Sequence, residues 1–147
     1  MKLSDIQTMW QKDCQVDDTK LDAELLKLPN LHSKYLGIYN DESLAQKKLF
    51  FENKRLLKFK TIWYAGKMSE EELEELGWEQ FSIKIIKGYE PKIETYLAGD
   101  DDLIEANQKF EYQKIKVEFL ESIIKSLNTR GYNIKAAIDF LRFTMGQ

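Results

Sequence analysis

The chain is poor in the residues that most catalytic and metal sites depend on. It has one cysteine, Cys14, and one histidine, His32, in 147 residues. A single cysteine excludes an intrachain disulfide. One cysteine and one histidine are too few for a Cys/His metal cluster, and a single histidine leaves little scope for a histidine-based catalytic triad. The only Gly-Lys pair, at residues 66–67, is followed by methionine, so a phosphate-binding loop is not indicated. These absences argue against an enzyme and against a bound cofactor.

Long hydrophobic runs are also missing. No apolar stretch approaches the length that spans a bilayer, and the N-terminal segment lacks the apolar core and cleavage site of a signal peptide. Together with the lone cysteine, these features predict a reducing, cytoplasmic location. Hydrophobic residues make up 43% and charged residues 32% of the chain, so it is neither disordered nor a membrane protein.

Turn-forming residues are few, with seven glycines and two prolines, and we predict a mainly α fold. Apolar spacing predicts a short helix over residues 3–12. A second helix starts after an N-cap at residues 17–19, breaks or kinks at Pro29, and resumes up to a turn at residues 37–41. A long helix is then predicted from residue 42 to residue 64, ending near Gly66.

The middle of the chain is predicted from shorter signals. Ser69 and Glu72 form a capping-box pattern that opens a helix over residues 70–76. One short strand is predicted from the alternation of Phe81, Ile83 and Ile85. Pro91 would start a further helix, and the acids at residues 100–102 would cap the one after it.

Apolar residues repeat every seven positions in the last third of the chain, beside a second apolar stripe. The pattern predicts a helical hairpin over residues 104–147, with a turn at residues 128–131 and a final helix capped by Asn133, after an N-terminal helical region over residues 1–103 of one compact chain. Two stripes exceed what a small domain covers, which favours packing on another subunit over burial in a monomer. The predicted oligomer contacts are Phe110, Val117, Leu120, Ile124, Leu127, Ile134, Ile138 and Leu141.

One basic block stands out in this acidic protein. Residues 46–67 hold seven cations and one acid, a net charge of +6, whereas the whole chain has a net charge of −3. Aromatic residues are threaded through the block, at Phe50, Phe51, Phe59, Trp63 and Tyr64. Cations with flat rings are what single-stranded nucleic acid requires, because its phosphates bind the charge and its unpaired bases stack on the rings.

A helical wheel divides the block into two sides. Basic residues fall outward and Leu49, Leu56 and Trp63 fall opposite, but Lys60 lies roughly 160° from Lys58. Either the Lys60 side chain extends out to solvent past its own apolar stem, or the helix ends or bends before it. The candidate phosphate contacts are Lys47, Lys48, Lys54, Arg55, Lys58, Lys60 and Lys67, and Trp63 or Tyr64 would stack on bases if exposed. A solvated outer face over a buried aromatic core is the plainer alternative.

Several short segments carry a resemblance when they are taken in order. They are Asp18-Thr19-Lys20-Leu21, Leu31-His32-Ser33-Lys34-Tyr35-Leu36, Leu57-Lys58-Phe59-Lys60 running into Trp63-Tyr64-Ala65-Gly66, and Arg130-Gly131-Tyr132 before Ile134-Lys135. In these the chain resembles the UvsY family of phage recombination mediators over most of its length. The resemblance places the family's DNA-binding basic pair on Lys58 and Lys60, where Lys60 replaces a more familiar arginine. It also matches the C-terminal region to the family's assembly region.

The resemblance implies a non-enzymatic protein that binds single-stranded DNA as a ring-like homo-oligomer, a hexamer or heptamer. Such proteins assist the loading of a RecA-like recombinase and help to displace the single-strand-DNA-binding protein already on the strand. The function predicted here is therefore that of a phage recombination mediator in homologous recombination and repair. The rival interpretation is a structural or assembly protein whose basic helix binds an acidic protein partner.

Overall fold

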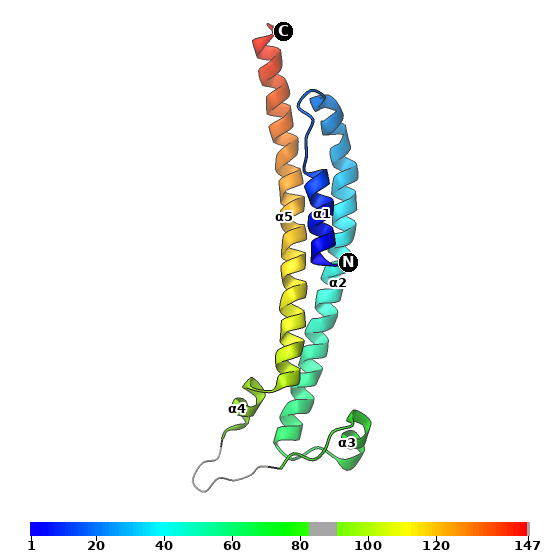
Figure 1. Ribbon diagram of the computed structural model, residues 1–147, viewed down its shortest axis with the longest axis vertical. Coiled ribbons are helices and arrows are strands. Elements are labelled where there is room, and N and C mark those ends of the chain that lie inside the picture. Colours follow the sequence, from blue (N-terminus) through cyan, green and yellow to red (C-terminus); the bar gives the residue numbers. More distant parts are fainter. Residues whose placement is uncertain (83–90, 147) are drawn as a thin grey trace. The chain divides into compact units, whose positions relative to one another are not determined.

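The computed structural model of the protein describes residues 1–82 and 91–146, which contain helices and no strand (Figure 1). The predicted mainly α class is confirmed. The strand residues Ile83 and Ile85 lie outside the described residues. Within the described part, no helix combines the length and the apolar character needed to cross a membrane. The helices are α1 (Leu3–Asp13), α2 (Leu21–Tyr64), α3 (Glu70–Leu76), α4 (Ile93–Ala98) and α5 (Asp101–Thr144).

Two compact units make up the chain, and each is described by itself. Unit 1 comprises residues 1–44 and 114–147, and unit 2 comprises residues 45–113. The long helices α2 and α5 each contribute residues to both units. The boundary predicted at residue 103 lies inside α5 and inside unit 2.

The core of unit 1 forms where α1 packs against α2 and α5 (Figure 1). Ile6 of α1, Tyr35 of α2 and Leu120 of α5 are fully buried, and Ile123 and Leu127 join them. Complete burial of an aliphatic or aromatic side chain contributes roughly 1.5–3 kcal/mol. One short helix is thereby held between two long ones.

Helix α2 continues through both interruptions predicted for it, so the break at Pro29 and the turn at residues 37–41 are wrong. A proline inside a helix removes one backbone donor and costs about 3 kcal/mol. Leu28 and Leu31 flank the proline and pack against the core of unit 1, and Tyr35 follows one turn later. Tertiary packing of this face outweighs the local breaking signals, since packing supplies most helical stability in proteins.

Helix α5 likewise continues through residues 128–131, so the predicted hairpin turn and the cap at Asn133 are wrong. Leu127 and Ile134 lie on either side of this segment and are both buried in unit 1. Seven positions separate them, so a continuous helix keeps both on one face. Gly131 lies within the helix, close to Leu28 of α2. A Cβ atom added at Gly131 would lie 3.5 Å from the Leu28 Cδ1 atom, which is an ordinary van der Waals contact.

The ends of the helices in unit 2 follow their local signals more closely. Gly66 ends α2 with a positive φ of 69°, and the Ser69–Glu72 capping box opens α3 as predicted. The Asp100 carboxylate accepts a hydrogen bond from the Leu103 backbone N–H at 2.9 Å and so caps α5. α4 begins at Ile93 with Lys92 as its N-cap, two residues after Pro91.

Candidate nucleic-acid interface

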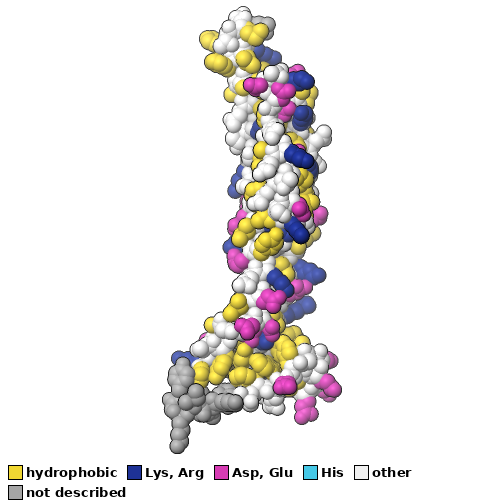
Figure 2. All heavy atoms as spheres, viewed as in Figure 1, with side chains coloured by type: hydrophobic (Ala, Val, Ile, Leu, Met, Phe, Trp, Pro, Cys, Tyr) yellow, Lys and Arg dark blue, Asp and Glu magenta, His cyan; other side chains and the backbone are white. Residues whose placement is uncertain are grey.

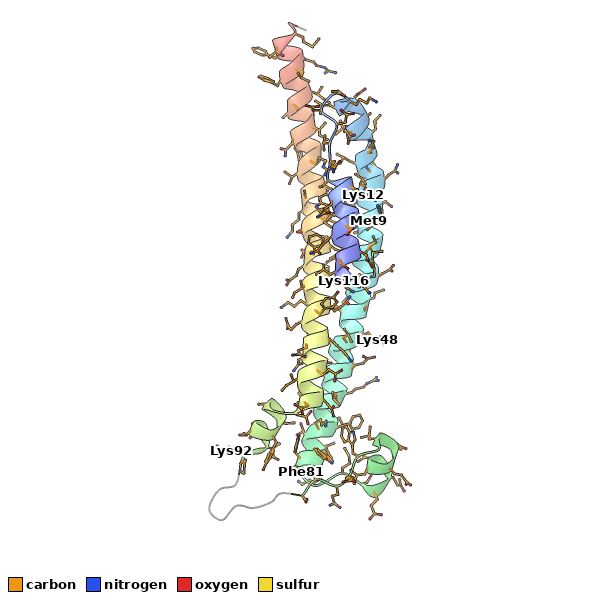
Figure 3. All side chains as sticks on the ribbon, viewed as in Figure 1. Met9, Lys12, Lys48, Phe81, Lys92 and Lys116 are labelled. Carbon is orange, nitrogen blue, oxygen red and sulfur yellow. The ribbon has the colours of Figure 1, made fainter. Side chains whose placement is uncertain are left out.

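One side of α2 in unit 2 carries exposed cations that we call the basic face: Lys47, Lys48, Lys54, Arg55 and Lys58. In Figure 3, Lys48 lies on a side of α2 that α5 does not cover. The opposite side is fixed to α5 by Asn53, whose side-chain amide donates to the Ala106 carbonyl oxygen at 3.2 Å. Because α2 is continuous here, the helical wheel applies and the basic residues share one solvent-facing surface.

The basic face keeps most of its positive charge. Among the described residues, the ion pair recorded for it joins Lys48 Nζ and Glu52 Oε1, at 3.9 Å. Such an exposed pair contributes at most about 1 kcal/mol. Lys54 Nζ lies 4.5 Å from the centroid of the Phe50 ring, and Lys58 Nζ lies 5.7 Å from that of Phe59. The neighbours of these two cations are therefore rings, so the face would attract a polyanion.

Lys60 is placed differently from the other candidate cations. Its exposed fraction is 5%, and its ammonium group lies 3.1 Å from an Asp100 oxygen and 2.8 Å from an Asp102 oxygen. The same Nζ lies 4.5 Å from the centroid of the Trp78 ring. Neither alternative that the sequence left open holds: α2 continues as a helix to Tyr64, and the Lys60 side chain is buried rather than extended out to solvent. The side chain turns inward instead, because α5 begins with carboxylates that receive it.

The charged groups around Lys60 stabilise one another. Burial alone would lower the pKa of Lys60, but hydrogen bonds to Asp102 and Asp100 outweigh burial and raise it. Burial alone would raise the pKa of Asp100, but hydrogen bonds from the Tyr64 hydroxyl, the Leu103 N–H and Lys60 hold it below its ordinary value. Both groups therefore stay charged. The cluster ties the C-terminal end of α2 to the N-terminal end of α5 within unit 2.

Trp63 and Tyr64 belong to an aromatic cluster beside this ion cluster. Trp63 contacts Trp78 and Phe81 edge-on or tilted, and Tyr64 stacks on Tyr96 with centroids 5.5 Å apart and an interplanar angle of 19°. The Trp63 indole N–H donates to the Glu79 carbonyl oxygen at 2.6 Å. Figure 2 shows hydrophobic side chains gathered here beside the acidic residues of α3. Both rings are half-buried, so the arrangement serves packing within unit 2.

Sequence analysis counted Phe50 and Phe51 among the rings of the basic block but singled out only Trp63 and Tyr64 as candidates for stacking on bases. Phe50 and Phe51 retain exposed fractions of 42% and 57% on α2. A signal was present, because Lys47, Lys48, Lys54 and Arg55 stand three or four positions before and after Phe51. Residues at this spacing are neighbours on a helix surface. Lys67, which was predicted as a DNA contact, is exposed in the turn after α2.

The predicted oligomer contacts separate into buried and accessible sets. Val117, Leu120, Leu127 and Ile134 are buried within unit 1 and serve its core. Phe110, Ile124 and Ile138 are half-buried, and Leu141 is exposed. Around Leu141, the C-terminal end of α5 presents further exposed apolar side chains, seen in Figure 2 at that end of the chain: Phe140, Phe143 and Met145.

The segments behind the family resemblance hold unit 1 together. Lys34 Nζ and the Tyr35 hydroxyl both bond to the Asp13 carboxylate, at 2.7 and 2.8 Å. Burial would raise the pKa of Asp13, but these bonds hold it below its ordinary value. The Arg130 guanidinium donates to the carbonyl oxygens of Asp13 and Cys14, each at 3.0 Å, and so caps the C-terminal end of α1.

Comparison with known proteins agrees with this architecture. A family model described as "Recombination, repair and ssDNA binding protein UvsY" matches residues 9–147. The chain belongs to the UvsY family. The recombination protein uvsY of Enterobacteria phage T4 is 25% identical over 147 residues and is covered completely, as is this chain. The predicted family resemblance is thereby confirmed.

Solved UvsY structures share the fold. One crystal structure of the bacteriophage T4 recombination mediator protein UvsY, in lattice type II, has a TM-score of 0.80 at 25% identity and covers 99% of this chain and 98% of that one. Another, in lattice type IV, has a TM-score of 0.76 at 24% identity, covering 98% and 99%. The chain is thus a helical member of a family of recombination, repair and single-stranded-DNA-binding proteins.

Proposed function

We propose that this protein binds single-stranded DNA through the basic face of α2. The observation that carries the proposal is that five exposed cations share one side of a continuous helix with a single, weakly paired acid. Such a surface can neutralise successive phosphates of one strand. Lys67 would extend the contact past the end of α2. Lys60, Trp63 and Tyr64 would support the interface from behind by fixing the end of α2.

The bound strand would be handed to a RecA-like recombinase, so the protein would act as a recombination mediator that helps to displace single-strand-DNA-binding protein. The family description supports recombination and repair as the setting. Holding and presenting a strand involves no covalent step, which agrees with a non-enzymatic role.

A homo-oligomer would strengthen a weak patch on each subunit by raising its effective concentration along the strand. The exposed apolar side chains of Phe140, Leu141 and Phe143 support an assembly surface at the end of α5, because contiguous exposed apolar residues mark interaction sites. Light scattering tests this proposal. The double variant Phe140→Ser with Phe143→Ser should have a lower particle mass than the parent, with unchanged helix content. An unchanged mass would contradict it.

Salt titration of binding to a fluorescently labelled thymine oligonucleotide tests the DNA proposal. Because counterions leave the phosphates, the logarithm of the association constant should fall linearly with the logarithm of salt concentration, by about 0.7 per neutralised phosphate on single strands. Lys54→Gln and Lys58→Gln should each reduce this slope by about that amount. Lys135→Gln, an exposed lysine of unit 1 outside the basic face, is the matched control and should leave it unchanged.

No binding at low salt would refute the DNA proposal. In that case the alternative of an acidic protein partner for the basic helix would be favoured. Slopes that respond equally to Lys58→Gln and to the Lys135→Gln control would place the DNA contact elsewhere on the chain.

A further inference from the structure

We infer that Phe51, with Phe50 beside it, is a stacking platform for unpaired nucleobases at the centre of the basic face. The inference rests on the proposed binding of single-stranded DNA. It adds a binding site for the bases of the strand, which the phosphate contacts do not provide. Phe51 exposes more than half of its surface on a helix whose opposite side is packed. Among the described residues, the ring contact recorded for Phe51 is with Phe50, so most of its ring surface is open to solvent.

The charges around Phe51 suit a nucleic-acid strand. Cations stand at all four helix-surface neighbours of this ring: Lys47 and Lys48 on the preceding turn, Lys54 and Arg55 on the following one. Phosphates held by these side chains would pass on both sides of the ring. The intervening base would then lie over its face, and every base has a flat face to offer.

Phe50 defines the edge of the platform. Its ring meets that of Phe51 edge-on at 5.4 Å and is tilted against Phe110 of α5 at 6.2 Å. An open groove of about 480 Å³ continues from it, lined by Phe50, Lys54, Leu57, Ile104 and Phe110. The volume lies within the range of about 300–1,000 Å³ found for small-molecule sites. A base displaced from the ring of Phe51 therefore has an apolar recess next to it, all within unit 2.

The rival occupant is the same surface of a second copy of the chain. Two copies meeting through this face would bring their cations together, with Glu52 as the acid standing among them. Like charges at close range oppose such a contact, whereas a strand brings phosphates of the opposite sign together with apolar ring faces. Charge complementarity thus favours the nucleic acid.

The test compares a thymine oligonucleotide with an abasic strand of the same length, which keeps the phosphates and lacks the bases. The intact protein should bind the thymine strand more tightly. Phe51→Ala should weaken binding of the thymine strand roughly five- to hundredfold, while the abasic strand and the salt slope are unaffected. Phe51→Leu keeps apolar bulk without a flat ring and should behave like Phe51→Ala, whereas Phe51→Tyr should behave like the parent.

Three results would overturn the inference. They are equal affinity of the parent for both strands, a Phe51→Leu variant that binds as well as the parent, and a change of particle mass that accompanies the loss of binding. In the first case a normal salt slope would leave the proposed DNA binding intact, so the two proposals fail separately. Failure to bind either strand would refute both.

Discussion

Replacement of Lys60 by methionine separates the phosphate-binding role that the sequence predicted from the structural role that its ion pairs with Asp100 and Asp102 indicate. Methionine keeps the length and apolar stem of the side chain and removes its charge. If Lys60 holds the ends of α2 and α5 together, Lys60→Met should lower stability and leave the number of phosphate contacts unchanged. If it binds phosphate, the reverse should hold.

The expected loss of stability in Lys60→Met depends on the carboxylates that would lose their ion-pair partner. Removal of one member of a buried ion pair costs about 3–5 kcal/mol, because the other charge stays buried. The Asp100 side chain is 5% exposed but keeps a hydrogen bond from the Tyr64 hydroxyl at 2.6 Å as well as its capping bond. We therefore expect the lower end, about 3 kcal/mol. Asp102 adds little, since its side chain is 60% exposed.

Urea unfolding followed by far-UV circular dichroism, at one fixed protein concentration, measures this loss. Lys58→Met is the matched control, because an exposed lysine should change stability by no more than about 0.5 kcal/mol. In double-mutant cycles, Lys60 should couple more strongly to Asp100 than to Asp102.

Salt-titrated DNA binding completes the comparison. Lys60→Met should retain the parental slope under conditions where it is folded, while Lys58→Met should lower it by about 0.7. A Lys60→Met variant with near-parental stability and a reduced slope would refute the assignment. Lys60 would then have to leave its carboxylate partners when DNA binds.

The glycines of the two wrongly predicted turns give a direct check on helix continuity: Gly37→Ala and Gly131→Ala should each raise the free energy of unfolding by about 0.5–1 kcal/mol, and a loss in urea melts would indicate a turn. Arg130→Ala should lower stability by about 1.5–3 kcal/mol through the two carbonyl oxygens it leaves unbonded, and Arg130→Lys should recover only part, because lysine lacks the planar fork. The lowered pKa values of Asp13 and Asp100 contribute stability that is present above the unfolded-state value of 3.8 and is lost as the pH falls through the folded-state values. The urea midpoint should therefore decrease as the pH is lowered from about 6 to about 2. Asp100→Asn should make this decrease smaller, whereas a pH profile identical to that of the parent would argue against the cluster.

Local signals predicted helix ends well and helix interruptions badly. The capping box at Ser69 and the positive-φ glycine at Gly66 act through hydrogen bonds within a few residues, so the sequence nearby contains all the information. Pro29 and Gly131 disfavour a helix locally, but Leu28 next to the proline and Leu127 one turn before the glycine pack in unit 1. Which of the two wins depends on residues far away in the chain, and no local pattern reports it.

The same limit explains the oligomer prediction. The heptad spacing of Val117, Leu120 and Leu127 indicates correctly that one face of α5 is covered. The spacing does not indicate which part of the protein covers that face. Ile6 and Tyr35 supply that cover from α1 and α2 of the same chain, and neither is close to α5 in sequence. The exposed rings at Phe140 and Phe143 fall outside the heptads and are part of the apolar surface that remains exposed on α5, together with Tyr112 and Ile115.

Helix geometry explains why the basic block has both outward-facing and inward-facing lysines. Two residues that are two positions apart lie on opposite sides of a helix, so Lys58 and Lys60 can share a surface only if the helix ends or bends between them. α2 continues to Tyr64, and one of the two must therefore face inward. A buried lysine needs carboxylates, and Asp100, which caps α5, is followed by Asp101 and Asp102 in its first turn. The acids that cap α5 thus also hold Lys60, and the DNA contact would fall to the cations that share the side of Lys58.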